Sequence, residues 1–217
     1  MAQPRIRRTE PRWPALVAMT AIGGLYYAMP SALTVGPDWL VLLLVLALGL
    51  PALITHRAGH WRAGHVLGYA MNSVVTLSLI VSIALLISRL PSHKETPQQL
   101  LVAAGALWTS NLLVFACWYW RLDAGGPHAR ALRASHTDGA FLFPQMMLEP
   151  ELRREMGEDH WSPGFIDYLF LAFNTSTAFS PTDVPVLSRW AKALMMIQAL
   201  ISLSTIAVLA ARAVNIL

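Results

Sequence analysis

The chain has 217 residues, of which 55% are hydrophobic and 13% are charged, and its mean hydropathy is +0.49. This composition excludes an ordinary soluble domain of this size and predicts one integral membrane unit. The formal net charge of +4 does not indicate nucleic-acid binding, because the basic residues gather at the ends of apolar segments, where orientation in the membrane explains them better.

Four apolar runs occupy the first half of the chain, at 13–29, 39–54, 66–88 and 99–120. A helix needs about 20 apolar residues to cross a membrane, so the whole chain has enough for five or six crossings. We therefore expect an all-α, polytopic transmembrane bundle of five to six hydrophobic helices. The arginines before the first run resemble the start of a signal peptide. That run is long and lacks a small-residue cleavage site, so we expect it to be retained.

These runs divide the chain into four regions. We expect a basic cytoplasmic N-terminus at 1–12, four transmembrane helices at 13–120, a polar cytoplasmic loop at 121–163 and a C-terminal helix pair at 164–217. The single cysteine, Cys117, lies inside a hydrophobic run, so no disulfide can form within these residues. We expect it to be a small buried hydrophobic side chain.

Three histidines follow the second apolar run, within two copies of an Arg-Ala-Gly-His sequence that end at His60 and His65. Together with His56 they suggest a metal site, because His56 and His60 would share one face of a helix. Gly59 and Gly64 disfavour a rigid helix there, and no acidic or thiolate ligand lies nearby in the sequence. We favour a basic loop resting on anionic lipid headgroups, and we expect no metal or cofactor.

The middle of the chain gives three further expectations. Asn72 and Thr76 lie on one helical face, which is typical of side chains that hydrogen-bond a neighbouring helix. The apolar island at 141–148, inside the polar loop, is expected to lie at the membrane surface. One short amphipathic helix is expected at 150–160.

The distribution of arginine and lysine favours a cytoplasmic N-terminus. If six runs cross the membrane, the outer side holds Arg89, Lys94, Arg189 and Lys192 of the 16 basic residues. If the fifth run enters and leaves from the inner side, Arg189 and Lys192 move inside and Arg212 moves outside. The charge distribution is compatible with both topologies.

The fifth run, 164–179, has 16 residues. That corresponds to roughly 24 Å of helix, which is short of a hydrocarbon core of about 30 Å. The run either crosses a thinned membrane or re-enters. Its second half leads into a cluster of polar side chains, which at membrane depth must face protein or water. We expect this cluster to be pore-like or substrate-contacting, with the residues Asn174, Thr175, Ser176, Thr177, Ser180, Thr182 and Asp183.

Two further features of the C-terminal pair have alternative interpretations. Ser180 and Asp183 have the spacing of an N-terminal helix cap, so Asp183 is either a cap or an ion contact. Gln198, Ser202 and Thr205 fall on one face of the final helix. That face either packs against another helix or lines a wet path.

A resemblance to a known family rests on four short motifs, namely Asp167-Tyr-Leu-Phe-Leu-Ala-Phe173, Thr182-Asp-Val184, Ser188-Arg189 and Ala213-Val-Asn215. They resemble a family of bacterial inner-membrane proteins of unknown function, which implies a polytopic protein of that membrane and no particular activity. The short Thr-rich helix, the turn and the long helix are also distantly similar to the pore helix, filter and inner helix of tetrameric cation channels. Pro181, and the absence of glycine after Gly164, exclude a potassium filter of the usual kind.

These observations lead to a channel-like or transport protein of the bacterial inner membrane that uses the C-terminal helix pair. The expected partners are membrane lipids, together with inorganic cations or a small solute, and a homo-oligomer is compatible with the channel resemblance. The alternative is a non-conducting membrane subunit or scaffold, in which the polar faces only hold helices together. The apolar runs carry no catalytic motif that supports an intramembrane enzyme.

Overall fold

The computed structural model describes residues 10–89, 96–132, 139–158, 161–177 and 183–214, and confirms the all-α prediction. Within these residues there is no β-strand, and one isolated antiparallel bridge joins Phe141 to Val186. The longer helices are α1 (Trp13–Tyr27), α2 (Leu40–Arg57), α3 (Trp61–Arg89), α4 (Pro97–Leu122), α8 (Phe165–Thr177) and α9 (Arg189–Val214). The short ones are η1 (Ser31–Leu33), η3 (Asp123–Gly125), α5 (Gly126–Leu132), α6 (Pro144–Met147) and α7 (Pro150–Glu155).

Four helices, α2, α3, α4 and α9, are long and apolar enough to cross a membrane, which is consistent with a multi-pass membrane protein. Helix α1 has 15 residues and α8 has 13, so both are shorter than a usual crossing. The total of five to six crossings therefore stays a prediction.

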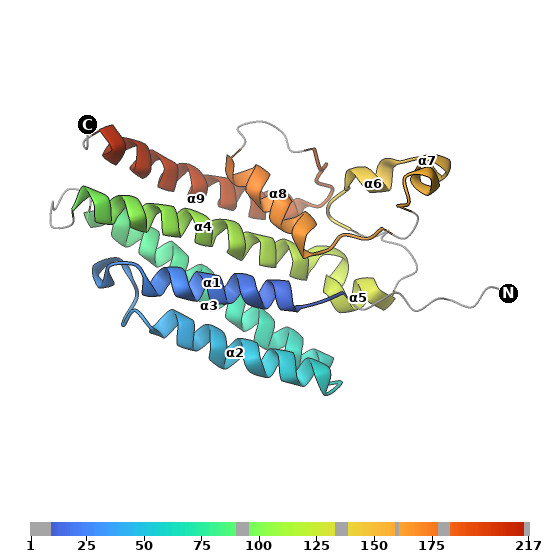
Figure 1. The fold of residues 1–217 in the computed structure, drawn as a ribbon, viewed down its shortest axis with the longest axis horizontal. Coiled ribbons are helices and arrows are strands. Elements are labelled where there is room, and N and C mark those ends of the chain that lie inside the picture. The colour runs from blue at the N-terminus through green and yellow to red at the C-terminus, as the bar shows by residue number, and fades with distance from the viewer. Residues whose placement is uncertain (1–9, 90–95, 133–138, 159–160, 178–182, 215–217) are drawn as a thin grey trace.

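Helix α4 lies at the centre of the bundle and packs against α1, α3, α8 and α9 (Figure 1). On one side of it, α1 and α2 form an antiparallel hairpin, and α2 packs along α3. On the other side lie α8 and α9. Leu107, Phe115 and Trp120 of α4 are fully buried, and so is Cys117, as its sequence context predicts.

Local sequence explains where α4 begins and ends. A capping box starts it: the Gln99 amide donates to the Thr96 hydroxyl, and the Gln99 side chain accepts from the Thr96 amide. Beyond its end, Gly126 adopts φ of 87°, and a Cβ atom there would lie 2.7 Å from the Arg121 carbonyl oxygen. Only glycine fits this position, so the chain can turn sharply into α5.

Helix α8 extends along only part of the bundle. Its 13 residues give about 20 Å of helix. Its last turn meets the middle of α9, where the Ser202 hydroxyl donates a 2.6 Å hydrogen bond to the Ser176 carbonyl oxygen.

The start of α8 and the segment that precedes α9 lie at the same end of the bundle, beside the end of α4. Near its start, Tyr168 donates a hydrogen bond to the Asp123 carboxylate. Beyond it, the Leu187 amide donates to the Ala140 carbonyl oxygen at 2.8 Å, and the Ala140 amide donates to the same carboxylate. The chain therefore returns, before α9, to the end from which α8 set out.

The structure corrects two expectations about residues 121–163. Asp123 and Arg130, placed by the sequence in a solvated loop, are buried. The apolar island does not lie wholly at the surface, because Phe141 and Phe143 are buried against the ring of Tyr168. The helix expected at 150–160 is present as α7, ending at Glu155.

The expected histidine loop is also mostly helical, which is a third correction. His56 lies in the last turn of α2 and His65 in α3, so only residues 58–60 connect the two helices. Gly64 does not break α3. A Cβ atom there would lie 3.1 Å from the Ala52 carbonyl oxygen, so the glycine allows α3 to pack closely on α2.

The return of the chain after α8 predicts which positions share a side of the membrane. Single cysteines replacing the exposed Leu152 and Leu187 should react with a membrane-impermeant thiol reagent from the same side, expected to be cytoplasmic, and a cysteine replacing Gln98 from the opposite side. Thiol labelling of inside-out and right-side-out vesicles measures this. The wild type, whose Cys117 is buried, supplies the background. Labelling of position 187 from the side of position 98 would show that α8 crosses the membrane.

Candidate functional site

The side-chain amide of Gln198 is the centre of a buried polar network between α4, α8 and α9. Its Nε2 atom donates to the Ala172 carbonyl oxygen and to the Ser176 hydroxyl, both at 2.8 Å. Its Oε1 atom accepts a short hydrogen bond from the Tyr119 hydroxyl. The amide is completely buried, and all these partners belong to the neighbouring helices.

Ser202 continues this network one turn further along α9. Its hydroxyl donates to the Ser176 carbonyl oxygen and accepts a 2.9 Å hydrogen bond from the Trp108 indole. The Asn111 amide donates to the backbone of Gln198 at 3.2 Å. The network thus fastens α8 and α9 to α4 in the middle of the bundle.

The predicted polar face of α9 is therefore buried between helices. Gln198, Ser202 and Thr205 are each no more than 2% exposed, and the Thr205 hydroxyl bonds to carbonyl oxygens of its own helix. Of the two interpretations of this face, the contacts within one chain favour packing over a wet path.

The other predicted residues of α8 lie toward its outer surface. Thr175 and Thr177 each donate a hydroxyl hydrogen bond to their own helix, to the carbonyl oxygens of Leu171 and Phe173. Asn174 is half-buried and Thr177 is exposed. A groove of about 300 Å³ between α8 and α9 is lined by polar residues of α8 and apolar residues of α9, namely Thr175, Ser176, Thr177, Met196, Ala199, Leu200, Leu203 and Ile206.

The remaining predicted residues precede α9. Ser180 and Thr182 lie outside the described residues, and Asp183 is exposed. Capping by Asp183 is wrong, because α9 begins at Arg189, where the Ser188 hydroxyl accepts from the Ala191 amide at 3.4 Å. The intervening chain is instead held beside residues 140–142 by backbone hydrogen bonds.

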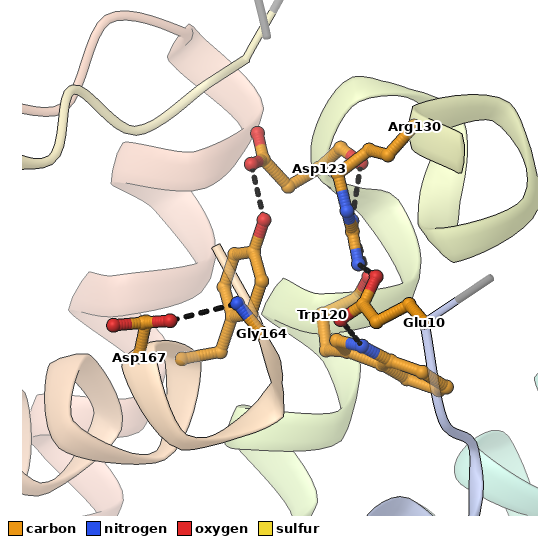
Figure 2. A network of polar contacts seen from close by, with 7 residues as sticks. Glu10, Trp120, Asp123, Arg130, Gly164 and Asp167 are labelled. Carbon is orange, nitrogen blue, oxygen red and sulfur yellow. Dashed lines mark hydrogen bonds and ion pairs between the residues drawn. The ribbon is translucent and has the colours of Figure 1, made fainter. Parts of the chain in front are cut away.

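A second buried polar cluster, unforeseen from the sequence, lies where α4 ends (Figure 2). The two carboxylate oxygens of Asp123 accept from the Tyr168 hydroxyl at 2.6 Å and from the Ala140 amide at 2.5 Å. Beside it, the Gly164 amide donates to the Asp167 carboxylate at 2.7 Å and closes the first turn of α8. Asp123 thus links the start of α8 to the chain beyond α5.

Arg130 completes this cluster on the side of the N-terminal segment. Its guanidinium donates to the carbonyl oxygens of Trp120 and Asp123 at 2.8 and 2.9 Å, and forms a 2.8 Å ion pair with Glu10. It also lies 5.1 Å from the centre of the Tyr168 ring. The second oxygen of Glu10 accepts from the Trp120 indole at 2.6 Å. A buried ion pair needs such additional partners, and here both ions have them.

Sequence reasoning missed Asp123, Arg130 and Tyr168. The sequence places Asp123 and Arg130 in the polar loop at 121–163, which follows the fourth apolar run. One signal could have singled out Asp123: it lies three residues after Trp120, the last aromatic residue of the run, where a carboxylate is close to the membrane. Its partner Tyr168 lies 45 positions away, a separation that leaves no periodic pattern.

The histidines meet around one aromatic ring and do not form a metal site. His128 stacks on Trp61 with ring centres 5.4 Å apart, and His56 and His65 approach this pair edge-on, whereas His60 is exposed. Among the described residues no group of three or more His, Cys, Asp or Glu side chains could hold a metal ion.

Comparisons with known proteins found no match, so the site is interpreted from its geometry alone. No protein-family model matches the chain, and no curated protein or solved structure does so either. What the structure establishes is an all-helical protein with four helices that could cross a membrane and a fifth, half-length helix fastened between two of them.

The Gln198 network makes a testable prediction about stability. Gln198→Leu keeps the volume but leaves the Tyr119 hydroxyl and the Ser176 hydroxyl without their buried partner. We expect a loss of about 1–2 kcal/mol in the free energy of unfolding, or roughly 2–8 °C in Tm. Thermal unfolding in detergent measures it. Ser204→Ala is the control, because the Ser204 hydroxyl is turned outward and bonds to its own helix. Equal Tm values for both variants would contradict a structural role for the network.

Proposed function

We propose that the protein is a multi-pass protein of the bacterial plasma membrane in which α8 re-enters the membrane and, with α9, forms a channel-like or transport element. The observation that carries this proposal is the half-length of α8, combined with the attachment of both its flanks to the end of α4. Irregular backbone at membrane depth is tolerated only where it is buried in protein or lines a water-filled cavity. Membrane transport proteins use broken and half-length helices in this way.

The chemistry at the C-terminal end of α8 supports a cation, with a small polar solute as the other substrate class. A helix C-terminus carries a partial negative charge and carbonyl oxygens without intrahelical partners. The Thr177 hydroxyl hydrogen is bound to the Phe173 carbonyl, so the lone pairs of the hydroxyl oxygen remain for a cation. Asn174 adds an amide oxygen in the last turn.

The charge distribution is compatible with the re-entrant orientation, as it is with six crossings. With a cytoplasmic N-terminus, the basic residues Arg189 and Lys192 then lie inside, and the outer side holds only Arg89, Lys94 and Arg212 of the 16 lysines and arginines. This is one fewer outside than in the six-crossing topology.

A homo-oligomer fits the position of this element. The groove between α8 and α9 is open on the outer face of the bundle, and its α9 wall is apolar. A second copy against this face would enclose the ends of α8 from both chains. Such an arrangement would resemble the shared axis of oligomeric channels, in which each chain contributes one re-entrant helix.

The alternative function is a non-conducting membrane subunit. The side chains of Gln198, Ser202 and Ser176 favour this alternative, because they form hydrogen bonds between helices of the same chain and act as packing contacts. In that case α8 would only stabilise the packing of the bundle, and its outer hydroxyl groups would have no transport role.

Cation flux into liposomes that carry the purified protein separates the two functions. If α8 contacts the ion, Thr177→Val should lower flux on the order of tenfold, because loss of one ion-contacting hydroxyl costs about 1–2 kcal/mol. Thr109→Val is a matched control, since the Thr109 hydroxyl makes the same bond to its own helix in α4. Absence of flux from the wild type would favour the subunit. An equal loss of flux in Thr177→Val and Thr109→Val would contradict the proposal that α8 contacts the ion.

If the protein conducts ions, we expect weak discrimination between potassium and sodium. Stringent selection needs closely spaced rings of carbonyl oxygens, which the proline at position 181 disfavours. Side chains such as those of Thr177 and Asp183 would leave water on the ion. Reversal potentials under opposed potassium and sodium gradients measure the ratio, with Asp183→Asn as a test of its carboxylate. A potassium preference of about a hundredfold would contradict the argument.

A further inference from the structure

A small cavity lies on the other side of α4, at the end of the bundle where α2 and α4 finish. Its volume is about 40 Å³, and it is partly open to the surroundings. Two arginines, Arg12 before α1 and Arg121 in the last turn of α4, line it. The other walls are mostly apolar and include Leu16, Ala52, Leu53 and Met71. Two cations therefore border one apolar cavity.

Both guanidinium groups have buried donors without a partner. The Nη2 atom of Arg12 and the Nε atom of Arg121 are inaccessible to solvent and make no hydrogen bond within the described structure. The hydrogen bonds of Glu10 go to Arg130 and Trp120, and its charge only partly offsets the effect of burial and of Arg121 on Arg12. Burial and the charge of Arg121 lower the pKa of Arg12 to about 10, so it stays cationic at neutral pH. Half-buried cations that each keep one buried donor without a partner favour an anionic ligand.

The position of Arg121 is set by its neighbours. A Cβ atom on Gly68 of α3 would lie 2.0 Å from the Nη1 atom of Arg121, so only glycine leaves room for the guanidinium. The guanidinium carbon lies 5.6 Å from the centre of the Trp120 ring. The Tyr69 hydroxyl donates to the backbone carbonyl of Arg121 at 3.4 Å. The Arg121 guanidinium thus packs between Gly68 and the Trp120 ring.

The surroundings of the cavity are basic. His56, at the end of α2, and His65 of α3 approach Trp61 and His128, and Arg62 lies over the same indole at 5.2 Å. The cavity itself is lined by no acidic side chain. The lining of the cavity would therefore offer an anion only cationic or neutral groups.

We propose that this cavity binds a phosphate group through the guanidinium groups of Arg12 and Arg121. Guanidinium groups present planar pairs of N–H donors that match the oxygens of phosphate. The cavity volume corresponds to a few water molecules, which suits a phosphate group, while the rest of a lipid headgroup would stay outside the opening. Basic pockets between transmembrane helices on the cytoplasmic side are typical sites for anionic lipid headgroups. A phospholipid headgroup and free phosphate share this chemistry.

The test uses the purified full-length chain in a neutral detergent after removal of bound lipid. Phosphatidylglycerol, diacylglycerol or inorganic phosphate is added, and the dissociation constant is obtained from the rise in Tm with ligand concentration. Diacylglycerol has the acyl chains without phosphate. We expect saturable binding of a phosphate ligand, weakened about tenfold in Arg12→Gln and in Arg121→Gln.

Two further variants separate the site from general effects. Gly68→Ala introduces a methyl group where the Arg121 guanidinium lies, and should weaken binding with both arginines still present. Arg62→Gln removes an exposed arginine outside the cavity and should bind as the wild type does. If Arg121→Gln fails to fold, Arg12→Gln and Gly68→Ala still test the proposal.

The ligand arms identify the source of the phosphate. Binding of phosphatidylglycerol, with no effect of inorganic phosphate at equal concentration, assigns the site to a lipid headgroup, whereas stabilisation by inorganic phosphate alone assigns it to the free ion. The proposal is overturned if neither ligand binds or if diacylglycerol stabilises the protein equally. It is also overturned if Arg12→Gln and Gly68→Ala bind like the wild type, or if Arg62→Gln weakens binding as strongly as they do.

Discussion

The carboxylate of Asp123 joins three segments that are far apart in the sequence. A buried carboxylate needs hydrogen-bond donors, and Asp123 accepts one from Tyr168 in α8 and one from the amide of Ala140. The carbonyl of Ala140 in turn accepts from Leu187, just before α9. The beginning of α8 and the beginning of α9 are therefore held at one end of the bundle. The return of the chain to this end before α9, and with it the proposed re-entrant element, depends on this chain of bonds.

A second constraint acts at the other end of α8. Hydrogen bonds from Gln198 and Ser202 fix its last turn against α4 and α9, so the helix is attached at both ends. In a hydrocarbon environment few competing partners exist for these groups. The attachment uses one face of α8 and leaves Thr177 on the other. The hydrogen bonds from Gln198 and Ser202 thus hold α8 in an orientation that leaves the Thr177 hydroxyl exposed. The transport proposal depends on this hydroxyl.

Helix α4 separates this element from the basic cavity. Successive residues of a helix point about 100° apart, so the end of α4 reaches several neighbours at once. Tyr119 bonds to α9, Arg121 lines the cavity beside α2 and α3, and Asp123, just beyond the helix, holds α8. A phosphate ligand at Arg121 would therefore lie within a turn of the residues that position α8. The proposed phosphate site and the proposed re-entrant element would therefore share one helix end.

The sequence by itself determined the features that depend on local composition: the long apolar helices, the burial of Cys117 and a fifth run too short for an ordinary crossing. It also singled out the polar face of α9. Only the tertiary structure decided that this face is closed by Tyr119 and Ser176, and that Asp123 and Arg130 are buried rather than solvated. The reason is physical. Hydropathy and helical period are local properties of the chain, whereas these polar groups are satisfied by partners up to 120 positions away, and no pattern in the sequence records which partner each will meet.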